Sequence, residues 1–208
     1  MSTIAILGSG IVGQTLAAGL RELGHDVTIG SRNGKAVEGW DGAVGTFTEA
    51  LAGATVAVLA VKGTVAQEVV ESLAADLADV VVLDTTNPMA DTAPTDGVLA
   101  YFTGPNESLL ERLQAAAPDA KFVKAFNSVG SALMVKPALT GGTPTMFIAG
   151  NDEAARSTVG EIVRSLGWDV EDLGSAAAAR AIEPLCMLWC IPGLRANDWM
   201  HAFAVLRP

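Results

Sequence analysis

The residues of this chain whose types and spacing best indicate chemistry are three glycines near its start, in the run Gly8-Ser9-Gly10-Ile11-Val12-Gly13. An apolar segment precedes the run and a helical pattern follows it, which is the context of a dinucleotide-binding site. Gly8 permits a tight turn, Gly10 lets the backbone approach a pyrophosphate, and Gly13 lets the helix pack closely on the strand. The pyrophosphate would lie at the helix N-terminus, where free N–H groups favour anions.

A second group of polar residues indicates which dinucleotide binds. An NAD site usually has an acidic residue about 20 residues after the glycines, where it holds the ribose 2′-hydroxyl. This chain has Ser31, Arg32 and Asn33 at that place, and none of them is acidic. A guanidinium beside a hydroxyl and an amide suits a 2′-phosphate. We therefore predict that the cofactor is NADP(H).

Continuous apolar segments alternate with helical patterns along the chain. Such segments are buried on both faces, so they predict an α/β fold, a Rossmann-type doubly wound parallel sheet with a smaller C-terminal α/β segment that ends in helices. The expected strands are residues 3–7, 26–30, 43–46, 54–61, 80–84, 121–125, 145–149 and 168–171. The expected helices are residues 11–23, a short one from Thr48, 64–78, 107–117, 152–166, 176–191 and 196–206.

We place a domain boundary near residue 130. Residues 1–130 would form the NADP-binding Rossmann domain, and residues 131–208 a small domain that walls the acceptor site. In an open parallel sheet, ligands bind beyond the carboxyl ends of the strands. Further cofactor-binding candidates therefore lie at the carboxyl ends of three of the expected strands or just beyond them: Ala60, Val61 and Lys62, then Thr86, Asn87 and Pro88, and then Ala125 and Asn127.

Composition excludes several classes of partner. The net charge of −10 argues against binding to nucleic acid or to an anionic membrane surface. The most apolar tract, Leu185 to Leu194, is shorter than the roughly 18 residues that a membrane span needs and contains Pro192. Cys186 and Cys190 lie four residues apart on an expected helix and are interpreted as reduced core residues, with no metal site. Together these features favour a cytoplasmic protein.

Several motifs resemble those of the NADP-dependent oxidoreductases of the deazaflavin coenzyme F-420, and the reductase domain of the six-transmembrane metalloreductases is also similar. The resemblance covers most of the chain. It rests on residues 8–13, Gly30-Ser31-Arg32-Asn33, Thr86-Asn87-Pro88, residues 123–130, residues 146–152 and residues 181–185. One departure is Lys62-Gly63, where the deazaflavin enzymes would have a proline and an aromatic residue. The chain has no six-transmembrane part, so we do not expect a reductase of that type.

The resemblance implies roles for several residues. Ser31 and Arg32 would hold the 2′-phosphate, and Asn87 and Asn127 would border the nicotinamide. The deazaflavin would lie across the nicotinamide, against the C-terminal region. Substrate-side candidates there are Glu183, Pro184 and Cys186.

We predict an enzyme that transfers a hydride between NADP(H) and a small-molecule acceptor, coenzyme F-420 or a flavin such as FMN. No catalytic residue is assigned, because hydride exchange between two rings needs alignment more than acid–base catalysis. Two alternatives remain open: an imine or hydroxy-acid reductase related to pyrroline-carboxylate reductase, and a non-catalytic module that senses NADP(H). The apolar C-terminal segment also suggests a homodimer through its last helices.

Overall fold

A computed structural model describes residues 1–208. Its main sheet has six parallel strands in the order β3-β2-β1-β4-β5-β6. The strands are β1 (Thr3–Leu7), β2 (Asp26–Ser31), β3 (Ala43–Thr46), β4 (Val56–Leu59), β5 (Val81–Asp84) and β6 (Lys121–Lys124). This is the strand order of a dinucleotide-binding fold, with the chain reversing direction across the sheet between β1 and β4. The predicted fold class is confirmed.

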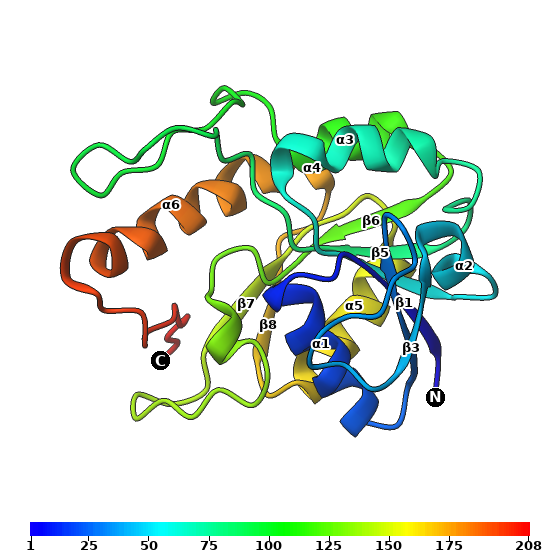
Figure 1. Cartoon of the computed structure of the whole chain (residues 1–208). Helices are drawn as coiled ribbons and strands as arrows, with labels where there is room; N and C mark the ends of the chain where they lie inside the picture. Colours follow the sequence, from blue (N-terminus) through cyan, green and yellow to red (C-terminus); the bar gives the residue numbers. More distant parts are fainter.

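Helices cover both faces of the sheet. Alternate residues of β1 show why: Ile4 and Ile6 pack into one hydrophobic cluster, and Ala5 and Leu7 pack into another. The first cluster holds α1 (Ile11–Glu22) and α5 (Glu153–Ser165) against the sheet. The second holds α2 (Phe47–Leu51), α3 (Gly63–Ser72) and α4 (Leu109–Ala116) against the other face. Figure 1 shows the sheet between these helices, with α3 and α4 on one side and α1 and α5 on the other. The continuous apolar strands of the sequence are therefore buried on both sides.

The chain returns to strand after residue 130. β7 (Thr145–Ile148) and β8 (Asp169–Asp172) form a parallel pair, and an antiparallel bridge between Lys124 and Ala149 joins the end of β7 to β6. The helix α5 between them packs into the cluster that also contains Ile4 and Ile6. The two segments on either side of residue 130 thus share one hydrophobic core, and their division into two domains stays a prediction.

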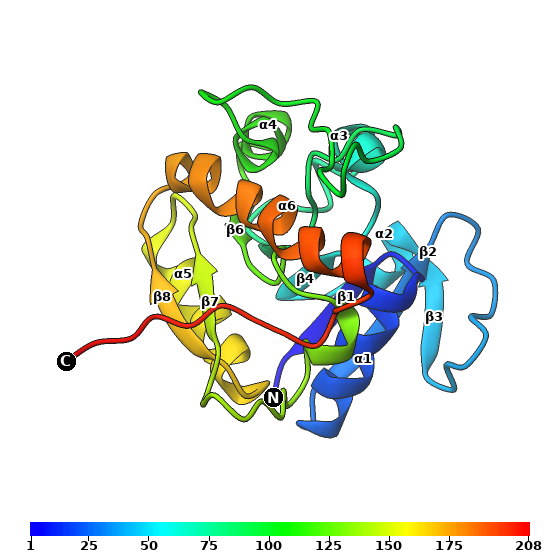
Figure 2. The same cartoon turned by 90° about the vertical axis from the view of Figure 1, so that its left-hand side faces the viewer.

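The C-terminal segment differs from its prediction. α6 (Ala179–Ala196) extends beyond residue 191 and through Pro192, and residues 197–208 contain no helix. Asn197 ends α6 in the left-handed conformation, with φ of 55°. The tail then runs back toward β7, where the Phe203 carbonyl accepts a hydrogen bond from the Thr145 N–H at 2.9 Å (Figure 2). The predicted helix 196–206 is therefore wrong, because tertiary contacts hold that apolar segment extended.

α6 is also longer than the apolar tract that the sequence singled out. The helical segment Ala176–Ala196 has a mean hydropathy of 1.2 and is long enough to cross a membrane, with 33% of its residues buried. Core helices of soluble proteins meet the same criterion of length and composition. This single helix is therefore weak support for a membrane span.

Candidate functional site

The turn between β1 and α1 has the shape of a phosphate cradle. Gly8 has φ of +133°, and a Cβ atom there would lie 2.3 Å from the Ala60 carbonyl oxygen. A Cβ on Gly13 would lie 2.1 Å from the Gly8 carbonyl oxygen, so this glycine permits the close contact of helix and strand. A Cβ on Gly10 would meet no atom within 4 Å. The space that a side chain would fill at Gly10 is therefore open to a ligand.

The first turn of α1 is available to an anion. Its N-cap, Gly10, supplies no side-chain hydrogen bond, and the turn contains no acidic residue. Ser9 and Val12 are half-buried, whereas Ile11 is exposed. The cradle and this helix N-terminus together fit a dinucleotide pyrophosphate.

The end of β2 presents a free guanidinium. Ser31 is buried, and its hydroxyl lies 3.4 Å from Asn33 Oδ1, which also accepts from the Lys35 N–H at 3.4 Å. Asn33 therefore shapes the turn. Arg32 is exposed and makes no ion pair or side-chain hydrogen bond in the structure. Its donors are free to bind a phosphate.

The residues after β4 lie close to the loop after β5. Ala60 and Val61 are half-buried, and Lys62 is the N-cap of α3 without a side-chain capping bond. A Cβ on Gly63 would lie 1.8 Å from the Asn87 carbonyl oxygen. The close approach of the start of α3 to the loop after β5 thus requires glycine at position 63, which gives a local reason for Gly63 in the Lys62-Gly63 departure.

Two predicted amides meet at the carboxyl edge of the sheet. Asn87 Nδ2 donates to the Asn127 carbonyl at 2.7 Å, and Asn127 Nδ2 donates to Asn87 Oδ1 at 3.1 Å. Asn127 Nδ2 also reaches the Ile182 carbonyl on α6 at 3.1 Å. Pro88 and Ala125 are buried beside them. The structure therefore brings these loops together, and the two amides bond mainly to each other.

A buried ionic cluster lies directly behind these loops. Lys124 Nζ is 2.6 Å from Asp84 Oδ2 and 3.0 Å from Glu183 Oε1, and all three side chains are at most 2% exposed. Asp84 Oδ1 accepts hydrogen bonds from the N–H and hydroxyl of Thr86 at 2.8 and 2.7 Å. No role for Lys124 or Asp84 follows from the sequence alone. The signal that could have found them was a charged residue at the end of each of two buried strands.

The three substrate-side candidates on α6 have different surroundings. Pro184 is exposed, whereas Glu183 and Cys186 are buried. Both oxygens of Glu183 accept N–H donors from α4, Leu110 at 3.0 Å and Leu109 at 2.9 Å. The Glu183 carboxylate therefore links α6 to α4 and Lys124, while its predicted contact with substrate stays a prediction.

Two further groups, one on α6 and one beside it, are held neutral. The Tyr101 hydroxyl donates to the Glu183 carbonyl at 2.8 Å, and burial raises the pKa of Tyr101. The pKa of the Cys186 thiol is raised by two effects, of which the larger is a hydrogen bond with Cys190 and the smaller is burial. Both groups therefore carry their protons at neutral pH. A thiol in this state is a poor nucleophile.

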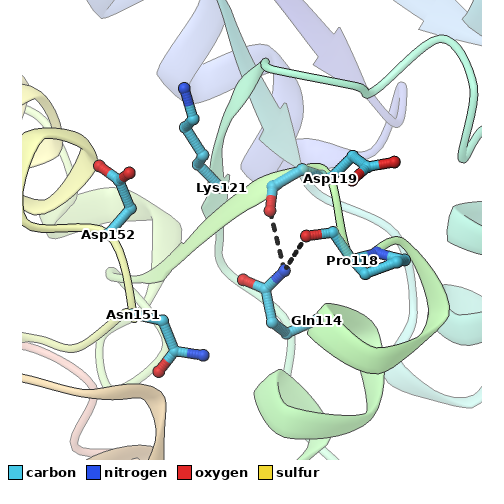
Figure 3. Close-up of a pocket in the computed structure, with 7 residues that line it drawn as sticks. Gln114, Pro118, Asp119, Lys121, Asn151 and Asp152 are labelled. Carbon is cyan, nitrogen blue, oxygen red and sulfur yellow. Dashed lines mark hydrogen bonds between the residues drawn. The ribbon is translucent and has the colours of Figure 1, made fainter.

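Two surface hollows lie away from this edge. One has a volume of about 400 Å³ beside Lys121, the first residue of β6, at the amino end of that strand (Figure 3). Gln114 lines it, but its amide already donates to the Ala120 carbonyl at 2.8 Å. The other, of about 470 Å³, lies along residues 137–143 and Gly167. The predicted site residues line neither hollow.

Known proteins resemble the chain over the parts that form this site. The family model of coenzyme F420-dependent NADP oxidoreductases matches residues 3–88. A crystal structure of a candidate F420-dependent NADP-reductase from Arthrobacter sp. FB24 is 32% identical, covers 100% of both chains and has a TM-score of 0.91. A hypothetical protein from Sinorhizobium meliloti is 27% identical over 86% of this chain and 88% of its own, with a TM-score of 0.71.

Metalloreductases are also similar in sequence. Metalloreductase STEAP3 of Rattus norvegicus is 32% identical over 93% of this chain, which spans only 39% of the length of that relative. An imine reductase from Streptomyces aurantiacus, 15% identical with a TM-score of 0.65, shares the fold. Because the Arthrobacter protein matches along its whole length and the family model matches the cradle, this chain belongs to the family of coenzyme F420-dependent NADP oxidoreductases.

Proposed function

We propose that this protein transfers a hydride between NADP(H) and a deazaflavin of the coenzyme F-420 type, or a flavin such as FMN. The free Arg32 guanidinium beside Ser31, at the end of β2, is the observation that carries the choice of NADP(H). A guanidinium can donate two parallel hydrogen bonds to a 2′-phosphate. When bound, NADPH supplies a hydride, two electrons with one proton, to the acceptor ring and leaves as NADP⁺.

The chemistry of the carboxyl edge supports a ring-shaped acceptor. The ionisable groups behind the edge, Asp84, Lys124 and Glu183, are engaged with one another. Tyr101 and Cys186 keep their protons because the pKa of each is raised. Oxidation of an alcohol or reduction of a carbonyl usually needs a general base or acid for the hydroxyl proton, whereas hydride transfer between two flat rings mainly needs their alignment.

Different segments of the chain would bind different parts of NADP(H) and of the acceptor. The backbone of the Gly8–Gly13 turn would hold the pyrophosphate, and Ser31 and Arg32 the 2′-phosphate. The loops at Thr86–Pro88 and Ala125–Asn127 would border the nicotinamide. The first half of α6, with Pro184 exposed and Cys186 buried, would wall the acceptor side.

Anaerobic stopped-flow spectroscopy tests this function. Purified protein is mixed with NADPH and coenzyme F-420, or with FMN, and the expected result is a saturable loss of NADPH absorbance coupled to reduction of the acceptor. Tight binding of NADPH without transfer to any acceptor of this type would contradict the proposal. It would favour the sensing module instead, which should distinguish NADPH from NADP⁺ without turning either over.

The same assay with cyclic imines and hydroxy acids tests the other alternative, an imine or hydroxy-acid reductase.

The proposal also includes the location and partners of the protein. We propose a cytoplasmic protein with a small-molecule acceptor and no nucleic-acid partner. Two free cysteines, Cys186 and Cys190, are consistent with a reducing compartment.

A further inference from the structure

A wholly buried lysine, Lys124, lies at the end of β6 beside the loops that would border the nicotinamide. Its ammonium contacts three oxygen atoms, Asp84 Oδ2 at 2.6 Å, the Thr86 carbonyl at 2.8 Å and Glu183 Oε1 at 3.0 Å. An ammonium has three donors, so each of them has one acceptor. Burial lowers the pKa of Lys124, but the two carboxylates outweigh burial and the net shift is upward. The side chain is therefore a cation at neutral pH.

The contacts of Lys124 reach separate segments of the fold. Thr86 is held at three atoms, because Asp84 accepts from its N–H and hydroxyl while Lys124 donates to its carbonyl. On the other side, Glu183 ties the same ammonium to α6 and to the first N–H groups of α4. Lys124 thus connects the loop after β5 with the helix beside the proposed acceptor site.

The amide pair extends this connection. Asn87 follows Thr86 directly and bonds to Asn127, which bonds in turn to the Ile182 carbonyl, next to Glu183. Gly63, the first residue of α3, packs against the Asn87 carbonyl. A displacement of Lys124 would therefore move the nicotinamide loops and α6 relative to each other.

Stability alone does not account for such a cluster. Replacing a buried ion network by apolar side chains of similar volume is often neutral or stabilising. Directional contacts, in contrast, fix the relative position of the groups that they join, and hydride transfer depends on that position. A misplacement of about 1 Å can reduce a rate about 100-fold.

We propose that Lys124 is a positioning residue, which fixes α6 against the Thr86–Asn87 and Asn127 loops and so sets the spacing between the nicotinamide and the acceptor ring. This inference rests on the proposed function. It gives the Asp84–Lys124–Glu183 cluster a role in kcat rather than in capture of the adenosine 2′-phosphate.

The test compares Lys124→Met with Lys121→Met. Lys121 is a matched control, because it lies on the same strand, at the opposite end, and is partly exposed in a 3.4 Å ion pair with Asp79. We expect Lys124→Met to reduce kcat with NADPH and coenzyme F-420 about 100-fold. The KM for NADPH and the affinity for adenosine 2′,5′-bisphosphate, measured by calorimetry, should stay within about threefold of wild type, a shift well below 1.4 kcal/mol. Lys121→Met should leave all three quantities unchanged.

A second variant decides the matter if Lys124→Met does not fold. Glu183→Gln keeps the shape of the side chain, removes the charge that faces Lys124, and replaces one oxygen that accepts an α4 N–H by an N–H donor, so it weakens the link between α6, α4 and Lys124. We expect it to keep the affinity for adenosine 2′,5′-bisphosphate and to lose kcat about tenfold or more, that is, about 1.4 kcal/mol or more of transition-state stabilisation. A folded Lys124→Met or Glu183→Gln protein with wild-type kcat would overturn the proposal. So would a parallel loss of kcat and bisphosphate affinity, because that pattern marks a merely structural role.

One readout separates this proposal from the function on which it rests. The fluorescence of bound NADPH reports the surroundings of the nicotinamide without any acceptor. We expect the Lys124→Met protein to enhance this emission less than wild type at saturating NADPH. If wild type transfers no hydride to any flavin-type acceptor, the proposed function fails. An unchanged emission in Lys124→Met would then overturn the positioning role as well, and a reduced emission would support it.

Discussion

At the scale of the residue, we expect Arg32 to determine the choice between the two nicotinamide dinucleotides. It is exposed and has no partner within the chain, so its removal should cost little stability. Arg32→Ala should weaken NADPH binding by about 1.5–3 kcal/mol, the value of a hydrogen bond to a charged group, and leave NADH binding nearly unchanged. Isothermal titration calorimetry measures both affinities.

The exposed Arg164 on α5 provides the control, and Arg164→Ala should bind both dinucleotides like wild type. An equal loss for NADPH and NADH in Arg32→Ala would show that the guanidinium does not read the 2′-phosphate.

Alanine substitution at two glycines of the carboxyl edge should change different properties, NADPH binding at Gly10 and the free energy of unfolding at Gly63. Gly10→Ala meets no protein atom within 4 Å, so its free energy of unfolding should change by less than about 1 kcal/mol while NADPH binding weakens. Gly63→Ala would place its Cβ 1.8 Å from the Asn87 carbonyl oxygen, and overpacking of this kind costs about 1–3 kcal/mol. Urea unfolding and NADPH titration distinguish the two effects. Wild-type NADPH affinity in Gly10→Ala would argue against a ligand at the cradle.

At the scale of the element, the sequence predicted the parallel sheet well, and its physical basis is clear. β1, β4 and β5 are short runs of apolar residues that need cover on both faces, so their type could be read locally. The prediction of a helix at residues 196–206 was wrong, because apolar residues of this kind can also pack against the rest of the fold as an extended segment. The Trp189 indole donates to the His201 carbonyl at 2.8 Å, and such distant contacts leave no local pattern.

The candidate site likewise has one part that the sequence predicts and one part that it does not. The Gly8–Gly13 turn and the Ser31–Asn33 loop could be proposed from the sequence, because each is contiguous and its spacing is typical of a dinucleotide-binding site. The Asp84–Lys124–Glu183 cluster could not, since its members come from β5, β6 and α6 and are adjacent only in the folded chain. The remaining local signal is a charged residue at the end of a buried strand, and this signal does not indicate which residue it contacts in the folded chain.

The contact between α4 and α6 should depend on pH. Arg180 on α6 donates to Glu111 on α4 at 2.6 and 2.9 Å, and this hydrogen bonding lowers the pKa of Glu111 from its ordinary value of 4.5. A carboxyl whose pKa is lowered in the folded state stabilises that state above the unfolded pKa, and the stabilisation is lost as pH falls through the folded pKa. Arg180→Ala should therefore lower Tm at pH 7, and the difference from wild type should shrink below pH 4.5.

Thermal unfolding followed by circular dichroism between pH 3 and pH 7 gives the comparison. Arg195→Ala is a control on the same helix, since Arg195 is exposed and forms no ion pair in the structure. A Tm difference for Arg180→Ala that stays constant across this range would show that the Glu111 contact does not contribute.

At the scale of the whole molecule, the exposed side of α6 is where a second copy would bind. Leu188 and Leu194 on this helix are 55% and 41% exposed, in a chain that carries a net charge of −10. A homodimer through this helix stays a prediction, and it competes with insertion of the same helix into a lipid bilayer. A self-complementary contact about a two-fold axis would cover the same leucines on both copies.

Sedimentation equilibrium at micromolar concentration distinguishes these outcomes. We expect wild type at twice the chain mass and Leu188→Glu at the mass of one chain, because a carboxylate at the centre of an apolar contact is desolvated without a partner. Leu173→Glu, at a residue 41% exposed beyond β8, should remain a dimer and serves as control. Wild type at the mass of one chain would contradict the dimer. Co-flotation of wild type with neutral phospholipid vesicles, lost in Leu188→Glu, would assign the apolar side of α6 to a membrane instead.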